Sequence, residues 1–303
     1  MMHGTPLMTL EQLRVFIAVA ERLHVTQAAE ALNMTQSAAS AAVQALETRL
    51  ATALFHRLGR RIELTEAGRV LLPEARAVLA RALEAEQALA ELEGLLRGRL
   101  RLWASQTIAG YWLPPYLHRF NIAHPQVKLE LHIGNSLQVS VAVLDGEADL
   151  GFIEGGNEEP LLAHIPVAVD RLVFVAAASH HLASRKSIEG SDTLKTRWVL
   201  RERGSGTRQI FEEALRKYGI DLHELDIAME LPSNEAVRSA VEAGAGATVI
   251  SRLVAAEGLS AGSLVELPLA FPDRRYLLLR HGDRHRSRAE NVLLDMIKKH
   301  SRH

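Results

Sequence analysis

Residues 25 to 47 constrain the fold of this chain more than any other stretch. They read VTQAAEALNMTQSAASAAVQALE, which predicts two short helices joined by a tight turn. Thr26 and Thr35 stand at the two helix starts, where a side-chain oxygen can accept a hydrogen bond from a free backbone N–H group. Apolar residues recur at three- and four-residue spacing in both segments and predict a shared inner face. This is the pattern of a helix-turn-helix.

The second of these helices carries small and polar residues on its outward face. They follow i, i+3, i+4, i+7 spacing: Ser37, Ser40, Ala41 and Gln44. Small side chains let a helix lie close to a surface, and hydroxyl and amide groups can hydrogen-bond to base edges in the major groove of DNA. With Thr35 and Gln36 at the helix start, this stripe is the predicted base-reading surface. An alanine-rich helical pair that only packs within its own domain is the alternative.

Two flanking segments favour DNA binding. Upstream, Thr9-Leu-Glu-Gln12 is a capping box that opens a third helix. Downstream, residues 54–68 (LFHRLGRRIELTEAG) alternate apolar and polar side chains around a central glycine, which predicts a short two-stranded wing. Arginines suited to contact phosphates lie around the tip of the wing: Arg57, Arg60 and Arg61. A charged, solvated hairpin is the alternative for the wing.

Composition is that of an ordinary globular protein, with 48% hydrophobic and 23% charged residues. The chain has no cysteine, no apolar run of membrane-spanning length and no signal-peptide pattern at its start, so we expect a cytoplasmic protein. The formal net charge is −1, and residues 1–68 hold six arginines and six glutamates. Affinity for DNA phosphates must therefore come from local clusters and from more than one copy of the domain.

The stretch from Leu10 to Gly68 resembles the winged helix-turn-helix of LysR-type transcriptional regulators. Three separated segments carry the resemblance, in the family's order: QLRVFIAVAE, LNMTQSAASAAVQALE and LFHRLGRRIELTEAG. The family implies a bacterial regulator that binds a dyad-symmetric operator in double-stranded DNA. Where the family often has proline, arginine and a second basic residue on the recognition helix, this chain has Ser37, Ala41 and Gln44. We therefore expect an unusual operator on the same fold.

From Leu71 the sequence has a heptad pattern of apolar residues. The steps alternate four and three over 26 residues, through Leu71, Ala75, Val78, Ala82, Ala85, Leu89, Leu92 and Leu96. Such a helix is about 39 Å long, and a sustained apolar seam requires a partner helix. We predict a dimerisation helix within residues 69–97, as the family also implies. Packing against the chain's own C-terminal domain is the alternative.

Residues 98–303 alternate strand-like runs with helical segments, which predicts an α/β fold. The predicted strands lie at 100–104, 127–133, 149–153, 171–177, 197–200, 226–231, 247–251, 264–268 and 276–280. The predicted helices lie at 113–122, 137–144, 209–217, 236–242 and 288–299. This half is similar to the two-lobed, periplasmic-binding-protein-like effector domain of the family. The resemblance implies lobe I at about 98–168 and 270–303, lobe II at about 169–269, and a DNA-binding domain at 8–68.

Hydroxyl groups follow two of the predicted strands at helix starts, in Ser105-Gln106-Thr107 and in Arg203-Gly204-Ser205-Gly206-Thr207-Arg208. A helix N-terminus favours an anion, glycines let the backbone approach it, and arginines add charge-assisted bonds. Asn135 and Asn234 lie at two further strand-to-helix junctions and are weaker candidates. Helix capping is the alternative for each segment alone. Their presence in both halves predicts a cleft for a small anionic effector, which the matching branch of the family also implies.

Catalytic and metal-binding patterns are absent from the sequence. Gly244-Ala-Gly246 lacks the third glycine of a dinucleotide fingerprint and follows a helix instead of opening one. Ser205 is not in a G-x-S-x-G elbow, and the histidines are not spaced with carboxylates as metal ligands. We expect no enzymatic activity, no metal, and no cofactor other than the effector.

Three functions compete at this point. The first is a sequence-specific transcription regulator of LysR type, a homodimer or tetramer controlled by a small anionic effector, with RNA polymerase as a further candidate partner and no membrane contact. The second is a cytoplasmic small-anion-binding or enzymatic α/β protein whose N-terminal helices only oligomerise it. The third is a non-specific nucleoid protein, which the neutral N-terminal domain disfavours.

Overall fold

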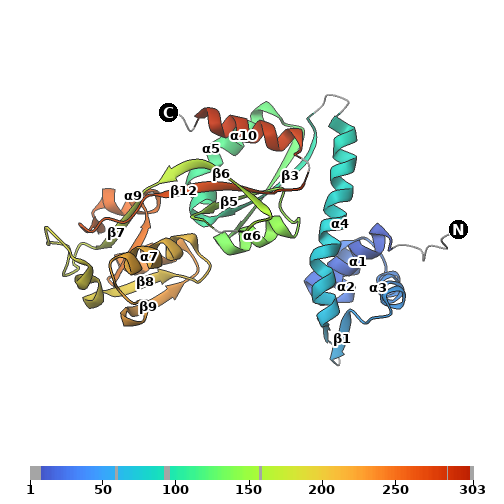
Figure 1. The fold of residues 1–303 in the computed structure, drawn as a ribbon, viewed down its shortest axis with the longest axis horizontal. Helices are drawn as coiled ribbons and strands as arrows, with labels where there is room; N and C mark the ends of the chain where they lie inside the picture. Colours follow the sequence, from blue (N-terminus) through green and yellow to red (C-terminus); the bar gives the residue numbers. More distant parts are fainter. Residues whose placement is uncertain (1–7, 59–60, 92–95, 157–158, 285, 301–303) are drawn as a thin grey trace. The chain divides into compact units, whose positions relative to one another are not determined.

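The structure is a computed structural model that describes residues 8–58, 61–91, 96–156, 159–284 and 286–300. It divides into two compact units, Met1–Gly94 with Asp145–Glu147 and Leu95–Leu144 with Ala148–His303. We call them the N-terminal and the C-terminal unit and describe each by itself (Figure 1). None of the helices in the described ranges is long and apolar enough to cross a membrane.

The N-terminal unit is a three-helix bundle followed by a hairpin and a long helix. In chain order the elements are α1 (Leu10–Arg22), α2 (Val25–Ala31), α3 (Gln36–Leu50), β1 (Phe55–Leu58), β2 (Arg61–Leu64) and α4 (Glu66–Glu91). Val15 and Val19 of α1 pack against Ala39 and Val43 of α3. The antiparallel strands β1 and β2 form the wing. The described parts of this unit are thus a winged helix-turn-helix with an apolar core.

Local capping sets where these helices begin. Thr35 caps α3, because its hydroxyl accepts a hydrogen bond from the Ala38 N–H at 3.2 Å, and Thr9 completes the predicted capping box with Gln12. The prediction for Thr26 is wrong. His24, in extended conformation, caps α2 through its ring Nδ1. Helix α2 starts one residue before Thr26, so that the threonine lies inside its first turn.

The heptad seam divides between two environments. Leu71 and Ala75 pack into the core of the N-terminal unit, whereas the side chains of Val78 and Leu89 are 45% and 68% exposed. Leu92 lies outside the described residues. The prediction for Leu96 needs correction, because α4 is described only to Glu91 and Leu96 packs against the core of the C-terminal unit. An apolar residue just beyond a helix can continue a heptad pattern in sequence without being part of the helix.

The C-terminal unit consists of two lobes, each built on a five-stranded sheet. Lobe I has the strand order β4-β3-β5-β12-β6 and lobe II the order β11-β7-β10-β8-β9. The lobe I strands are β3 (Gly98–Ser105), β4 (Val127–Gly134), β5 (Leu150–Glu154), β6 (Leu162–Asp170) and β12 (Arg274–His281). The lobe II strands are β7 (Leu172–Ala177), β8 (Arg197–Arg201), β9 (Asp226–Leu231), β10 (Ala247–Ser251) and β11 (Leu264–Glu266). The chain passes between the lobes after β6 and again before β12 (Figure 1).

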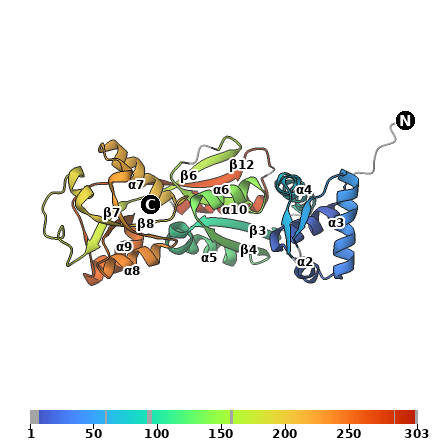
Figure 2. The ribbon, with the colours of Figure 1, turned by 90° about the horizontal axis from the view of Figure 1, so that it is seen from below.

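Helices cover both faces of each sheet (Figure 2). In lobe I these are η1 (Ile108–Trp112), α5 (Pro114–Ala123), α6 (Ser136–Leu144) and α10 (Arg288–His300). In lobe II they are η2 (Gly190–Lys195), α7 (Gly206–Lys217), η3 (Leu222–Glu224), α8 (Asn234–Glu242) and α9 (Arg252–Ala261). Helix α7 packs on one face of the lobe II sheet, where Phe211 contacts Trp198, and α8 and α9 pack on the other.

One strand and one α-helix of the C-terminal unit were not predicted from the sequence. Strand β6 contains Pro166, which argues against a strand, yet β6 is an edge strand and the ladder with β12 shifts register close to this proline. An edge tolerates the missing N–H group. Helix α9 contains Gly258, which usually weakens a helix. Here a Cβ atom at Gly258 would lie 2.6 Å from the Glu242 Oε1 atom and 2.8 Å from the Leu264 Cδ1 atom, so any other residue would force these side chains to shift.

Candidate functional site

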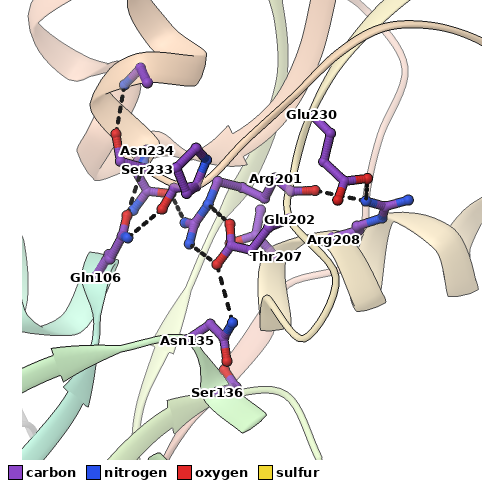
Figure 3. Close-up of polar contacts among 12 residues, drawn as sticks. Gln106, Asn135, Ser136, Arg201, Glu202, Thr207, Arg208, Glu230, Ser233 and Asn234 are labelled. Atoms are coloured by element: carbon purple, nitrogen blue, oxygen red, sulfur yellow. Dashed lines mark hydrogen bonds and ion pairs between the residues drawn. The ribbon is translucent and has the colours of Figure 1, made fainter. Parts of the chain in front are cut away.

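The strand-to-helix junctions of both lobes meet in the C-terminal unit. Parallel strands end at one edge of a sheet, which brings the junctions after β3 and β4 in lobe I opposite those after β8 and β9 in lobe II. Hydrogen bonds cross between the lobes at this edge. The Leu137 N–H group at the start of α6 donates to the Gly204 carbonyl at 3.2 Å. Figure 3 shows the polar side chains that converge there.

Arg201 is the cation at the centre of this cluster, with only 4% of its surface exposed. Its Nε and Nη2 atoms donate to the Glu202 carboxylate at 2.8 and 2.9 Å. Its Nη1 atom donates to the side-chain oxygen of Asn234 at 2.5 Å. The same carboxylate of Glu202 accepts a bond from the Asn135 amide of lobe I at 3.3 Å (Figure 3). The Glu202 carboxylate therefore accepts the hydrogen bonds of the Arg201 guanidinium. Because it also bonds to Asn135, it joins the two lobes.

Asn234, at the start of α8, is also held from lobe I. Its side-chain amide donates to the Thr107 hydroxyl at 3.0 Å, and its backbone N–H donates to the side chain of Gln106 at 3.0 Å. The Gln106 amide in turn donates to the Pro232 carbonyl at 2.7 Å (Figure 3). Gln106 thus binds the N-terminal end of a helix in the other lobe.

A second buried cation, Arg274, lies where the chain re-enters lobe I. Its Nε atom donates to Asp170 at 2.7 Å, and its Nη1 atom donates to the Thr207 hydroxyl at 2.7 Å. Its Nη2 atom lies 3.7 Å from Glu154 and 3.4 Å from the Thr107 hydroxyl. Burial lowers the pKa of Arg274, but the charges of Glu154 and Asp170 outweigh burial and raise the pKa above its ordinary value. The guanidinium therefore stays charged while buried.

A buried hydroxyl group at the end of β3 has no partner in the described part of the chain. The Ser105 hydroxyl is fully buried and makes no hydrogen bond. The Thr107 and Ser205 side chains make no capping bond to the helices that follow them. Helix capping, the alternative for these hydroxyl groups, therefore does not account for them.

Apart from Ser105, the predicted effector residues fall into two groups. Gln106, Thr107, Asn135, Thr207 and Asn234 meet around the two buried arginines. The other group consists of Arg203, Ser205 and Arg208 of lobe II. These residues line a pocket to which lobe I contributes no residue.

Sequence reasoning did not single out the two buried arginines or Glu202. For Arg201 and Glu202 a signal exists, since two charged residues directly follow the buried strand WVL. Nothing in the sequence distinguishes Arg274, which is buried, from its neighbour Arg275, which is exposed.

In the N-terminal unit, α3 presents the predicted base-reading stripe to solvent. Ser37, Ala41 and Gln44 are exposed, as are Thr35 and Gln36, whereas the opposite face is buried. Ser40 is half-buried.

The wing is attached to α3 by Glu47, which was not predicted from the sequence. Its carboxylate accepts the Leu54 and Phe55 N–H groups at 2.7 and 3.2 Å. Of the wing arginines, Arg61 is exposed, only the backbone of Arg57 is described, and Arg60 lies outside the described residues.

Two family models match this chain. The model described as "LysR substrate binding domain" matches residues 93–302. The chain belongs to the LysR family. The model described as "Bacterial regulatory helix-turn-helix protein, lysR family" matches residues 10–69 of this LysR-type regulator. It is a DNA-binding transcriptional regulator with a two-lobed effector-binding domain, and the family and fold class predicted from the sequence are confirmed.

Relatives of this LysR-type regulator match most of its length. It is similar to the HTH-type transcriptional regulator YeiE of Escherichia coli, with 40% identity over 289 residues, 95% of this chain and 96% of the relative. The CcmR regulatory domain of Synechocystis PCC6803, solved in complex with 2-PG, is 28% identical with a TM-score of 0.60, covering 67% of this chain and 97% of that one. Full-length CbnR, solved with its target DNA, is 22% identical with a TM-score of 0.67, covering 96% and 99%, and shares the fold.

Proposed function

We propose that this LysR-type regulator binds a small anionic effector between its lobes, on the guanidinium of Arg201. The observation that carries the proposal is the Glu202 carboxylate, which takes two parallel hydrogen bonds from this buried cation. Carboxylate and phosphate groups of ligands use the same geometry on arginine. An effector anion can therefore take the place of the Glu202 carboxylate. The related CcmR regulatory domain was solved in complex with 2-PG, which supports a small-molecule effector for this domain.

Displacement of Glu202 gives the effector a way to act on the protein. The Glu202 carboxylate also accepts a bond from Asn135 in lobe I. An anion that replaces it on Arg201 removes one lobe-to-lobe contact and offers its own oxygens to Asn135, Thr107 and the Ser105 hydroxyl. A ligand shifts a conformational equilibrium only by its difference in affinity for the two states. Here the two states differ in the group that bridges the lobes. In one state it is the Glu202 carboxylate, and in the other it is the carboxylate or phosphate of the effector.

The proposal extends to DNA and to assembly. We infer that the exposed stripe of α3 reads base edges of a dyad-symmetric operator and that Arg57, Arg60 and Arg61 contact phosphates. The exposed part of the α4 seam binds α4 of a second copy, which makes the regulator a dimer or a tetramer. Domain limits near residues 68 and 97 separate DNA binding, dimerisation and effector binding.

Asn234→Asp tests the effector site. Aspartate keeps the acceptor that Arg201 needs, so the fold should survive, but it places a negative charge where the anion binds. Thermal shifts of wild type and variant should be compared with sulfate, inorganic phosphate and 2-PG, with glycerol as the uncharged control. We expect at least one anion to stabilise the wild type, and the variant to lose at least about tenfold in affinity for it. The effector site is refuted if no anion stabilises the wild type or if both proteins respond equally.

A further inference from the structure

Lobe II contains a pocket of about 510 Å³ between α7, η3 and the strands β8 and β9. All of its lining residues belong to lobe II. The volume is that of a small-molecule site. The buried arginines of the cleft, Arg201 and Arg274, are not among the lining residues. The pocket is therefore separate from the site proposed between the lobes.

The charge balance of this pocket favours an anion. Its lining holds Arg203, Arg208 and Arg216 but a single acidic residue, Glu212. Arg208 is already engaged, since it donates to Glu212 at 2.8 Å and pairs with Glu230 beside the pocket. With both glutamates counted against the three arginines, one positive charge is left over. Among the described residues no ion pair involves Arg203, whose exposed side chain can reach a ligand.

The other lining residues include four apolar side chains, beside Gly204, Gln209 and His223. Leu200 and Leu225 are buried, Leu222 is half-buried, and the side chain of Ile227 on the edge strand β9 is 41% exposed. A ligand with an apolar body would remove this surface from water, which is favourable. Ser205 adds a hydroxyl group at the end where Arg203 lies. Its side chain is buried and makes no capping bond to α7.

We propose that this pocket is a second ligand site, for a small organic monoanion that has an apolar body. The anionic group lies at Arg203 and Ser205, and the apolar body covers Leu222, Leu225 and Ile227. The site goes beyond the effector cleft and does not depend on it, because it uses neither buried arginine of the cleft.

Phenylacetate is a suitable probe, because it combines one carboxylate with an apolar ring. Binding to the full chain should be measured by isothermal titration, with acetate as the control without a ring and phenylacetamide as the control without a charge. We expect phenylacetate to bind more tightly than either control. Arg203→Gln and Ile227→Asp should each weaken phenylacetate by about tenfold or more.

Two matched variants distinguish binding in this pocket from binding elsewhere on the chain. Arg197→Gln removes another exposed arginine, which pairs with Asp226 outside the pocket lining, and it should leave phenylacetate affinity unchanged. Asn234→Asp changes the cleft and should also leave it unchanged. The proposal is overturned if phenylacetate does not bind, if the pocket variants bind it as the wild type does, or if Asn234→Asp abolishes binding. If phenylacetate does not bind, or binds the pocket variants as it binds the wild type, the thermal-shift test of the cleft is unaffected, so the two sites can fail separately.

Discussion

Two hydroxyl groups of the cleft, two residues apart, have opposite surroundings. The Thr107 hydroxyl accepts bonds from Asn234 and Arg274, whereas the Ser105 hydroxyl is buried with no partner in the described part of the chain. Thr107→Val removes the acceptor of two buried donors and should lower the free energy of unfolding by about 1–3 kcal/mol. Ser105→Ala removes a buried group that makes no bond, so the free energy of unfolding should stay the same or rise.

Urea denaturation of both variants measures this contrast. If the Ser105 hydroxyl also contacts the effector, Ser105→Ala weakens anion binding without loss of stability. A Ser105→Ala variant that is destabilised as much as Thr107→Val would contradict the prediction, because it would mean that the serine has a partner in the folded chain.

The same residues mark the limit of what the sequence could predict about the site. Thr9 and Thr35 were identified as caps because a cap and its partner lie three residues apart, and the sequence displays both. Thr107 and Asn234 were both identified as candidates, but their contact spans 127 residues. Arg274 reaches its partner Asp170 across 104 residues. Local patterns give the residue types at each junction, and only the assembled sheets decide which of them meet.

At the scale of single elements, the start of α10 is sensitive to pH. Glu290 and Ser287 exchange hydrogen bonds there, from the Glu290 N–H to the serine hydroxyl at 3.2 Å and from the Ser287 N–H to the carboxyl at 3.3 Å. Burial, with the nearby charge of Asp149, raises the pKa of Glu290 from 4.5 to about 7. The folded state thus keeps a proton that the unfolded chain loses at lower pH.

Glu290 ionises at lower pH in the unfolded chain than in the folded one, and this order sets how the free energy of unfolding changes with pH. Below pH 4.5 both states are protonated at Glu290, and the folded state has its full stability. Between pH 4.5 and about 7 the unfolded chain ionises while the folded carboxyl does not, so the free energy of unfolding falls as pH rises. The loss is at most about 3 to 4 kcal/mol, at about 1.4 kcal/mol for each unit of the pKa shift from 4.5 to about 7.

Glu290→Gln tests this account, since glutamine keeps a capping oxygen and does not titrate. We expect the stability of the wild type relative to the variant to decrease from pH 4.5 to 7 and to be constant above about pH 7.5. Urea denaturation at each pH gives both curves. Parallel curves would mean that Glu290 titrates alike in the folded and unfolded states.

Elements were predictable where their pattern was strong and local. The helix-turn-helix, the wing and α4 follow from capping residues, alternation and heptad spacing. Strand β6 and helix α9 were missed because Pro166 and Gly258 oppose the structure that each element adopts. An edge position tolerates the proline, and close packing against Leu264 favours the glycine. Both exceptions depend on neighbours that are distant in sequence.

For the whole molecule, DNA binding depends on assembly because the N-terminal part carries little charge. Residues 1–68 contain six arginines and six glutamates, with no net attraction to phosphates. A single copy therefore gains little non-specific affinity. Two linked copies contact two half-sites, and linkage alone can add 10²–10⁴ in affinity, roughly. The exposed part of the α4 seam, at Val78 and Leu89, is the surface that can link them.

Replacing Val78 and Leu89 together by aspartate places charges in that contact and should give a monomer. Leu83→Asp is the matched control, since Leu83 is exposed on the same helix but does not belong to the seam. We expect sedimentation at micromolar concentration to give the mass of one chain, 33.4 kDa, for the double variant and a multiple of it for the wild type and the control. Affinity for an operator fragment, selected from genomic DNA with the wild type, should fall at least about a hundredfold in the double variant only. An unchanged mass would exclude α4 as the dimer contact. A monomer that still binds its operator tightly would show that a single N-terminal domain without net charge is enough for tight binding.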